Sequence, residues 1–216
     1  KKMLKYVVLV PAFNELENIK KIIKFKYNYL ILDDCSTDGT TEFLKKNKIK
    51  YIRNNKNLGY EKNIKKGFQY LKFKKYKGNV ITIDGDNQHP INSIKPIYKF
   101  FLKKNLDLLI CNRNKKNRFL ESVIGYLSYK LFNIKDPLSG MKIYKNNIIN
   151  KNFNSIYNDT YFTGLVFLAI KKKMKIANYE IKVKESYKSK IGYSIKVYIK
   201  LIKIFFYFLI LKIELR

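Results

Sequence analysis

Short apolar runs alternate along this chain with longer stretches in which apolar residues recur every three or four positions. The runs predict strands at residues 6–10, 29–32, 50–53, 80–83 and 106–111. The periodic stretches predict helices near residues 15–26, 38–47, 60–73 and 91–104. This alternation predicts an α/β fold in which helices flank a mostly parallel sheet.

The pattern is less regular beyond residue 112. It predicts a helix near 119–133, a strand near 141–144, a helix near 160–173 and a strand near 176–183. We expect one domain over residues 1–192, followed by a C-terminal helix over residues 193–216. Asn14 is the predicted N-cap of the first helix, and Ser36 or Thr37 that of the second.

The C-terminal stretch 195–215 is dense in Ile, Leu, Phe and Tyr, with Lys196, Lys200 and Lys203 spaced along one side. Its longest uncharged run, residues 204–211, has eight residues, whereas a membrane-spanning helix needs roughly 20. The pattern favours an amphipathic helix that lies in a membrane interface. A helix docked on the domain core is the alternative.

Charge adds to this picture. The net charge is +30, yet only four of the 46 basic residues are Arg, and the lysines are spread along the whole chain. This spread predicts no nucleic-acid partner, but a basic surface attracts phosphorylated substrates and anionic membranes, at about 1 kcal/mol per basic residue near the membrane.

Cys35 and Cys111 offer neither metal spacing nor a disulfide framework. With no signal-peptide pattern at residues 1–5, we expect the cytoplasmic face of a membrane.

Asp84 and Asp86 follow the fourth predicted strand, with Gln88 two residues further on. If that strand is buried, the two carboxylates lie at the carboxyl edge of the sheet, where α/β proteins bind ligands. Two carboxylates and an amide carbonyl suit a hard divalent cation that also holds phosphate, either Mg²⁺ or Mn²⁺. A plain turn between strand and helix is the alternative for an isolated Asp-x-Asp.

Three further motifs lie at predicted strand ends or helix starts: Pro11-Ala12-Phe13-Asn14-Glu15, Asp33-Asp34-Cys35-Ser36-Thr37-Asp38-Gly39-Thr40 and Asn57-Leu58-Gly59. Together with Asp-x-Asp-x-Gln-His-Pro, they resemble the family 2 glycosyltransferases over about residues 4–192. The resemblance implies the Rossmann-like GT-A fold and transfer of a sugar from a nucleotide-sugar donor.

Four later segments are similar to the dolichyl- and polyprenyl-phosphate sugar synthases of that family: Cys111-Asn112-Arg113, Arg118-Phe119-Leu120-Glu121-Ser122, Asp136-Pro137-Leu138-Ser139-Gly140-Met141 and Lys184-Glu185-Ser186-Tyr187-Lys188-Ser189-Lys190. Cys-Asn replaces their usual Gly-Ser, Lys184 stands where Arg is usual, and the last segment lacks a glycine. The missing glycine at Ser186-Tyr187 bears on the motion of that last loop.

The resemblance also implies roles for individual residues. Asp86 would be the central metal ligand, assisted by Asp84 and Gln88, whereas the sole histidine, His89, would be structural. The donor, GDP- or UDP-linked, would be bound by Pro11, Phe13, Glu15, Leu32 and Asp34, with Lys184 and Lys190 closing over it.

The acceptor decides whether a general base is needed. A polyprenyl phosphate is already anionic, so it needs cationic groups instead, and Arg113 and Arg118 suit that role because guanidinium binds phosphate oxygens bidentately. Ser122 would add a hydroxyl or cap its helix. A saccharide acceptor, with Asp159 as general base, stays open.

Two points remain open at this stage. The chain could have a membrane-anchoring partner or form a homo-oligomer. A non-enzymatic protein that adheres to membranes or nucleic acid through its charge is the remaining alternative, which the intact Asp-x-Asp disfavours.

Overall fold

Seven strands form one sheet in the order β3-β2-β1-β4-β6-β5-β7. The structure, a computed structural model, describes residues 5–116, 118–150, 160–184 and 195–215. The strands are β1 (Tyr6–Ala12), β2 (Tyr29–Asp33), β3 (Tyr51–Arg53), β4 (Asn79–Thr82), β5 (Leu108–Arg113), β6 (Lys142–Tyr144) and β7 (Ile176–Ile181). All seven fall where the apolar runs predict them.

The helices are α1 (Leu16–Ile22), α2 (Thr40–Lys46), α3 (Tyr60–Phe73), α4 (Ile94–Lys103), α5 (Phe119–Phe132), α6 (Asn146–Asn150), α7 (Tyr161–Lys171) and α8 (Ile195–Glu214). A short 3₁₀ turn, Ile91–Ser93, precedes α4. The sequence pattern predicts every helix except the five-residue α6, which is too short to show a helical period.

β6 is antiparallel to both of its neighbours, β4 and β5, and the other strand pairs are parallel. Six strands therefore end at the same edge of the sheet. β1 and β4 are neighbours, so the residues that follow them meet at that edge. Ligands of open α/β sheets bind there, and the predicted motifs lie at the expected end of the fold.

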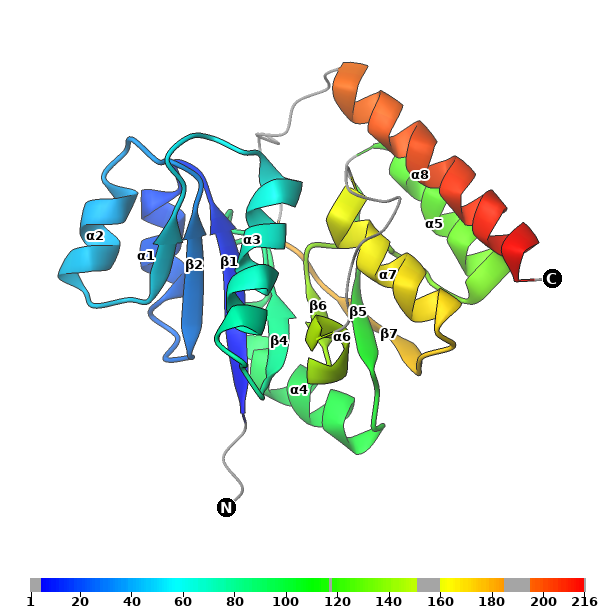
Figure 1. The fold of residues 1–216 in the computed structure, drawn as a ribbon, viewed down its shortest axis with the longest axis horizontal. Coiled ribbons are helices and arrows are strands. Elements are labelled where there is room, and N and C mark those ends of the chain that lie inside the picture. The colour runs from blue at the N-terminus through cyan, green and yellow to red at the C-terminus, as the bar shows by residue number, and fades with distance from the viewer. Residues whose placement is uncertain (1–4, 117, 151–159, 185–194, 216) are drawn as a thin grey trace.

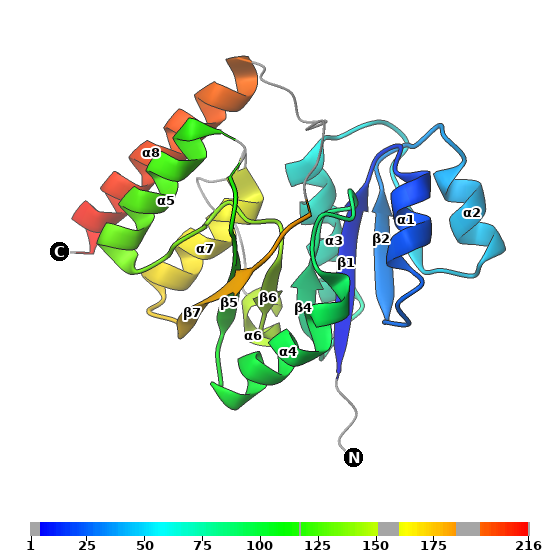
Figure 2. The ribbon, with the colours of Figure 1, turned by 180° about the vertical axis from the view of Figure 1, so that it is seen from behind.

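Helices cover both faces of the sheet, as predicted. Val8 and Val10 of β1 pack with apolar residues of α1, α2 and α4, whereas Val7 and Leu9 pack with those of α3, α6 and α7. Figure 1 shows α3 and α7 in front of the sheet, and Figure 2 shows α1 and α4 on its other face. This alternation is the two-residue period of a strand buried on both sides.

Close packing of α3 on the sheet corrects one predicted site residue. A Cβ atom added to Gly67 of α3 would lie 2.5 Å from Leu32 Cδ1, so only glycine allows the helix to approach this far. The Leu32 side chain is fully buried there. It belongs to the core and cannot line a ligand site.

Glu15 and Gly39 hold the N-cap positions of α1 and α2 that we predicted for Asn14 and for Ser36 or Thr37, and Asp38 accepts from the first N–H group of each helix. Its carboxylate accepts hydrogen bonds from Leu16 N at 2.9 Å and from Thr40 N at 3.0 Å, and so caps both α1 and α2. Asn14 instead lies in the left-handed region with φ 54°. One acidic side chain thus orients two helices, which sequence spacing alone could not reveal.

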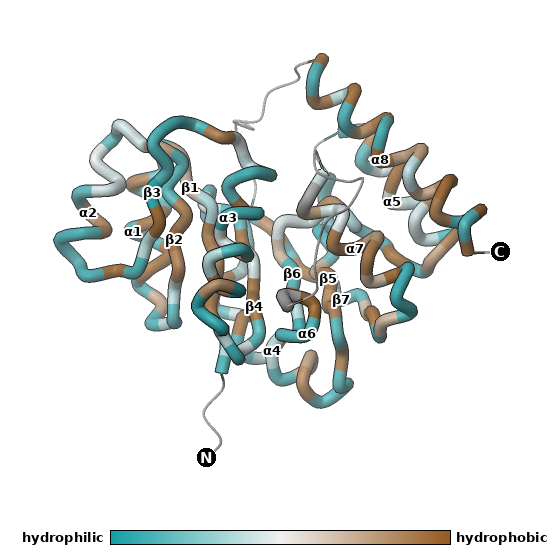
Figure 3. The backbone as a smooth tube through the Cα atoms, viewed as in Figure 1, coloured by the Kyte–Doolittle hydropathy of each residue, from teal (hydrophilic) through white to brown (hydrophobic). Residues whose placement is uncertain are grey.

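The C-terminal helix α8 lies beside α5 in both views (Figures 1 and 2) and packs against α5 and α7. Its inner face is apolar and buried: Leu201, Ile204, Phe208 and Leu211. Its outer face is apolar and exposed: Ile195, Ile199, Ile202, Phe206, Ile210 and Ile213. In Figure 3 most of its C-terminal half has the colour of hydrophobic residues.

Both alternatives for this segment therefore hold in part. α8 is docked on the domain, yet the side turned away from the domain is apolar rather than basic, and the lysines lie along one flank of it. Lys200 of this flank forms an ion pair with Glu61 of α3. Among the described helices, none is long and apolar enough to cross a bilayer.

Phe208→Ala should lower the free energy of unfolding by about 3–5 kcal/mol, because it removes a fully buried ring and leaves a cavity. Urea denaturation followed by circular dichroism measures the change. Ile210→Ala, on the exposed face of the same helix, is the control and should change stability by roughly 0.5 kcal/mol or less. Equal losses in both variants would show that α8 is not docked through its inner face.

Candidate functional site

Asp84 lies at the carboxyl edge of the sheet, just beyond β4, and three segments hold its carboxylate. Tyr60 Oη of α3 donates a hydrogen bond to Oδ1 at 2.9 Å, and His89 Nε2 lies 3.0 Å from Oδ2. A Cβ atom added to Gly140 would lie 2.0 Å from Oδ2, so the turn before β6 presses directly on the carboxylate. The Asp84 side chain is nevertheless 31% exposed, which leaves it accessible from the site.

The loop that follows Asp84 is equally tight. A Cβ atom on Gly85 would lie 2.4 Å from Pro11 O at the end of β1, so this position requires glycine. Asn87 has φ 60°, and Gln88 N donates to Asp86 Oδ1 at 3.0 Å. The Asp-Gly-Asp segment therefore folds back on β1 and brings its second carboxylate close to the first.

The two carboxylates repel each other. Burial and the charge of Asp84 raise the pKa of Asp86 to about 6. Burial also disfavours a charged Asp84, but the hydrogen bonds from His89 and Tyr60 and the charge of Arg113 hold its pKa below the ordinary value. Asp86 is the carboxylate whose negative charge most needs a cation nearby.

The donor set fits a divalent cation that is shared with a bound phosphate. Within the described residues, no group of three or more His, Cys, Asp or Glu side chains could hold a metal. Among the same residues, Gln88 N donates a hydrogen bond to Oδ1 of the Asp86 carboxylate. Mg²⁺ and Mn²⁺ are commonly held by one or two carboxylates plus substrate phosphates rather than by an all-protein cage. Asp86 and Asp84 would hold such an ion.

Lys184 lies beside this loop, and its predicted contact with the donor stays a prediction. Its backbone N–H donates to Gln88 O at 3.0 Å, so the segment after β7 runs along the Asp-Gly-Asp loop. Lys190 and Asp159 lie outside the described residues. The predicted closing of Lys190 over the donor and the alternative general base Asp159 both stay predictions.

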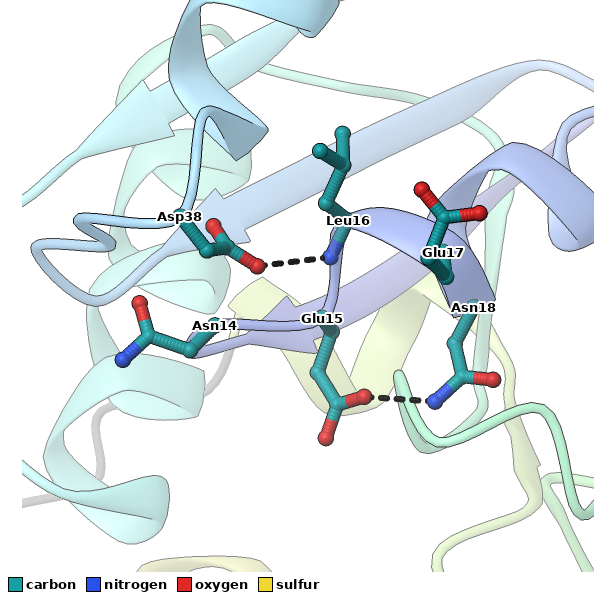
Figure 4. Close-up of a pocket in the computed structure, with 6 residues that line it drawn as sticks. All are labelled: Asn14, Glu15, Leu16, Glu17, Asn18 and Asp38. Atoms are coloured by element: carbon teal, nitrogen blue, oxygen red, sulfur yellow. Dashed lines mark hydrogen bonds between the residues drawn. The ribbon is translucent and has the colours of Figure 1, made fainter.

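The residues predicted to bind the nucleoside lie around the end of β1. Phe13 is 43% exposed, whereas Pro11 is buried. Glu15 accepts a hydrogen bond from Asn18 Nδ2 at 2.6 Å. It also lines a shallow pocket of about 260 Å³ at the start of α1, where Figure 4 shows the Asp38 carboxylate directed at the backbone of Leu16. Of these nucleoside residues, only Glu15 lines that pocket.

Asp34 has a structural task in addition to its predicted one. Its Oδ1 accepts from Asn54 Nδ2 at 2.8 Å and from Leu58 N at 2.9 Å, and its Oδ2 accepts from Gly59 N at 2.8 Å. Gly59 has φ 79°, a conformation that favours glycine. Asp34 therefore holds the Asn-Leu-Gly loop that begins α3, and its contact with a nucleobase stays a prediction.

The structure brings Arg113 and Arg118 together, but through carboxylates. The Glu121 carboxylate bridges them, with Arg113 Nη2 at 3.2 Å and Arg118 Nη1 at 2.5 Å. Asp136 accepts from Arg113 Nε at 2.9 Å and from Nη2 at 3.1 Å. Two guanidinium groups and two carboxylates balance in charge. The sequence analysis predicted that both arginines bind the acceptor phosphate, and it did not predict their ion pairs with Glu121 and Asp136.

These ion pairs are buried, and they fix the guanidinium groups. Burial disfavours the charge of Arg113, but hydrogen bonds and the charges of Asp136 and Glu121 raise its pKa. Arg113 ends β5, so it lies at the same edge of the sheet as Asp84. Ser122 is exposed on the first turn of α5, and Arg118 rather than Ser122 occupies the N-cap position of that helix.

Asn112 marks a departure from the resembled family and has an unusual environment. Within the described part of the chain, its amide oxygen and nitrogen are both buried and lack hydrogen-bond partners. Such an amide loses its hydration without compensation, at a cost of about 1–3 kcal/mol. Cys111 N donates to Met141 O, so Asn112 lies across β6 from the Asp84 side of the site.

Lys142 is the residue of this region that sequence reasoning missed. It is fully buried on β6, and its Nζ donates to Ser139 O at 2.5 Å and lies 3.7 Å from the centre of the Phe162 ring. Burial lowers its pKa to about 7, against the opposing charges of Asp136 and Asp84. The available signal was a lysine inside the apolar run Met-Lys-Ile-Tyr, where burial is expected on both sides.

The mostly parallel sheet, with paired carboxylates beyond β4, has the GT-A fold. Residues 7–165 match the family described as glycosyl transferase family 2. The chain belongs to that family and is a glycosyltransferase.

Sequence relatives agree with this assignment. An uncharacterized protein of Methanocaldococcus jannaschii is 33% identical over 163 residues, which cover 64% of this chain and 71% of that protein. CsbB of Bacillus subtilis, a putative glycosyltransferase, is 26% identical over 195 residues, 80% of this chain and 57% of CsbB. The match to CsbB thus spans little more than half of that relative.

Solved structures share the fold. Glucosyl-3-phosphoglycerate synthase from Mycobacterium tuberculosis, in complex with Mn²⁺, uridine diphosphate and glucosyl-3-phosphoglycerate, has a TM-score of 0.70 at 17% identity. That comparison covers 97% of this chain and 80% of the other. The same enzyme in complex with phosphoglyceric acid has a TM-score of 0.72 at 18% identity, covering 95% and 80%.

Tyr60→Phe should weaken Mn²⁺ binding about 10-fold in the presence of UDP or GDP, because it removes the hydroxyl that orients Asp84. Titration of free Mn²⁺ by electron paramagnetic resonance measures the affinity. Tyr70→Phe, an exposed tyrosine of the same helix, is the matched control and should bind as the unaltered protein does. Equal affinities in all three proteins would exclude Asp84 from the cation site.

Proposed function

We propose that this protein transfers a sugar from a GDP- or UDP-linked donor to a polyprenyl phosphate at the cytoplasmic face of an anionic membrane. The observation that carries this proposal is the juxtaposition of Arg113 and Arg118 on Glu121, at the same sheet edge as Asp84. Two of the four arginines in a lysine-rich chain meet at this one point. Guanidinium pairs of fixed geometry suit a phosphate acceptor.

Glu121 supports this role although it balances the charge. It holds two sets of N–H donors close together, and a phosphate offers oxygens of similar spacing. The acceptor phosphate would share or replace the Glu121 contacts. Such a phosphate is already anionic, so its oxygen attacks the anomeric carbon without a general base. The bond to the diphosphate breaks as the new bond forms, and the anomeric configuration inverts.

The donor would lie between the end of β1 and the Asp-Gly-Asp loop. A divalent cation bound there, Mg²⁺ or Mn²⁺, would offset the charge that develops on the departing nucleoside diphosphate. Asp86, with a pKa raised to about 6, would hold it together with Asp84. Phe13, exposed beside this loop, would contact the nucleoside.

The outer face of α8 supports the membrane part of the proposal. Six exposed apolar residues recur along it, and lysines run along one flank, a pattern typical of helices that lie in an anionic interface. The neighbouring α5 also carries exposed aromatic residues, with Phe119 85% exposed directly after Arg118. A prenyl chain leaving the arginine pair would enter the bilayer beside them. A reducing compartment suits the two free cysteines.

Radiolabelled GDP- or UDP-sugars, incubated with Mn²⁺ and undecaprenyl or dolichyl phosphate, should yield label that an organic solvent extracts. Arg118→Lys keeps the charge beside the buried Glu121 but loses the guanidinium fork. It should raise KM for the lipid phosphate at least 10-fold and leave KM for the donor unchanged. Asp159→Asn should be tolerated.

Label found only in a water-soluble glycan would contradict the lipid acceptor. With loss of activity in Asp159→Asn and tolerance of Arg118→Lys, that result would favour a saccharide acceptor and Asp159 as general base.

Replacing Ile199 and Phe206 together by Ser should weaken binding to phosphatidylglycerol vesicles roughly 100-fold, because each buried apolar side chain contributes about 1.5–3 kcal/mol. Sedimentation with vesicles measures the partition. Phe73→Ser removes an even more exposed aromatic residue from α3 and should bind as before. If both proteins lose binding equally, or neither does, α8 is not the membrane-binding element.

A further inference from the structure

Lys142 has an environment that stability alone does not explain. Its ammonium group lies in the interior, over the Phe162 ring and against the carbonyl of Ser139. Replacing a buried charged group by an apolar one of similar volume is often neutral or stabilising. A methionine here would fill the same space without a charge. The lysine at this position therefore calls for a role in the site.

The contacts of Lys142 lead to Asp84 through one turn of the chain. Nζ donates to Ser139 O at 2.5 Å, and the next residue, Gly140, is the one against which the Asp84 carboxylate packs. Thr82 Oγ1 donates to Gly140 O at 2.9 Å, which ties the same turn to the end of β4. Two hydrogen bonds thus fix the surface on which Asp84 rests.

Phe162, on the first turn of α7, contacts both Lys142, which fixes the turn under Asp84, and Tyr60, which binds Asp84 directly. Its ring faces Lys142 Nζ on one side and meets the Tyr60 ring edge-on, with centroids 5.7 Å apart. Tyr60 is the residue whose hydroxyl binds Asp84. Phe162 N in turn donates to Glu61 at 2.7 Å, so the first turn of α7 is itself anchored to α3.

We propose that Lys142 is a positioning residue for sugar transfer: by fixing the Ser139–Gly140 turn, it sets the orientation of Asp84 for the divalent cation. Lys142 touches neither the cation nor the substrates in this arrangement. The proposal rests on the metal site of the proposed function, but not on the identity of the acceptor.

The direction of the effect separates positioning from simple charge. If the substitution only removed a positive charge near the two carboxylates, the site would attract a divalent cation more strongly. Loss of the hydrogen bond to Ser139 O would instead release the turn and let Asp84 move. Weaker Mn²⁺ binding after removal of the charge can therefore come only from lost positioning.

The test is Lys142→Met, titrated with Mn²⁺ by electron paramagnetic resonance in the presence of UDP or GDP. We expect Mn²⁺ affinity and kcat to fall about 10-fold, as for other residues that orient a metal ligand. The melting temperature should stay equal or rise. Unchanged or tighter Mn²⁺ binding in the folded variant would overturn the proposal.

Two further variants complete the experiment. Lys145→Met removes a lysine just beyond β6 that is 40% exposed and pairs with Asp107, and it should leave Mn²⁺ affinity unchanged. Phe162→Leu keeps the site apolar but removes the ring that faces the ammonium group, and it should weaken Mn²⁺ binding about threefold. If Lys142→Met fails to fold, unchanged affinity in Phe162→Leu overturns the proposal. If the unaltered protein binds no Mn²⁺ with either nucleotide, the metal site of the proposed function fails first.

Discussion

Two carboxylates held close together at a partly buried sheet edge are the constraint around which this site is built. Left alone, Asp84 and Asp86 repel each other, and burial makes that repulsion stronger. The structure places the two carboxylates in different environments. A tyrosine, a histidine and a glycine turn hold Asp84, whereas burial and the charge of Asp84 raise the pKa of Asp86. In the proposed function, Asp86 would be the main ligand of the cation, and Asp84 would be the ligand whose orientation its neighbours fix.

Two arginines bring positive charge into the interior, whereas most lysines keep it at the surface. Lysines are spread over the exterior, where the flexible side chain keeps its ammonium group in water, whereas Arg113 and Arg118 meet on a buried carboxylate. Guanidinium groups keep a fixed fork of donors when they are desolvated, which an ammonium group cannot do. Lys142 is the exception, and its pKa lowered to about 7 shows how strongly burial disfavours its charge.

α8 carries the exposed apolar surface and also contacts α3, the helix that holds Asp84. Its inner face packs on α5 and α7, and Lys200 pairs with Glu61 of α3, the residue that also binds the start of α7. Tyr60, one residue before Glu61, holds Asp84. The helix that we propose for the membrane interface is therefore linked to Asp84 through Glu61 and Tyr60, which are neighbours on α3.

The sequence by itself determined the order of strands and helices and the position of the Asp-x-Asp motif. Periodicity is a local property, so it is readable wherever a strand is buried on both faces or a helix on one. Resemblance in four short motifs placed the family. Local patterns did not predict α6 or the capping by Asp38, because one is too short for a period and the other joins segments about 20 residues apart.

Tertiary structure alone decided what each polar side chain faces. It placed Leu32 in the core, gave Arg113 and Arg118 a shared carboxylate, and set Lys142 beneath the site. None of these follows from spacing along the chain alone. The place of Lys142, for example, depends on β6 running antiparallel between β4 and β5 and carrying residues 139–142 to Asp84. Charge and hydrogen-bond partners are often residues far apart in the sequence, so they depend on the packed molecule. Hydrophobic periodicity depends only on residues that are neighbours in the sequence.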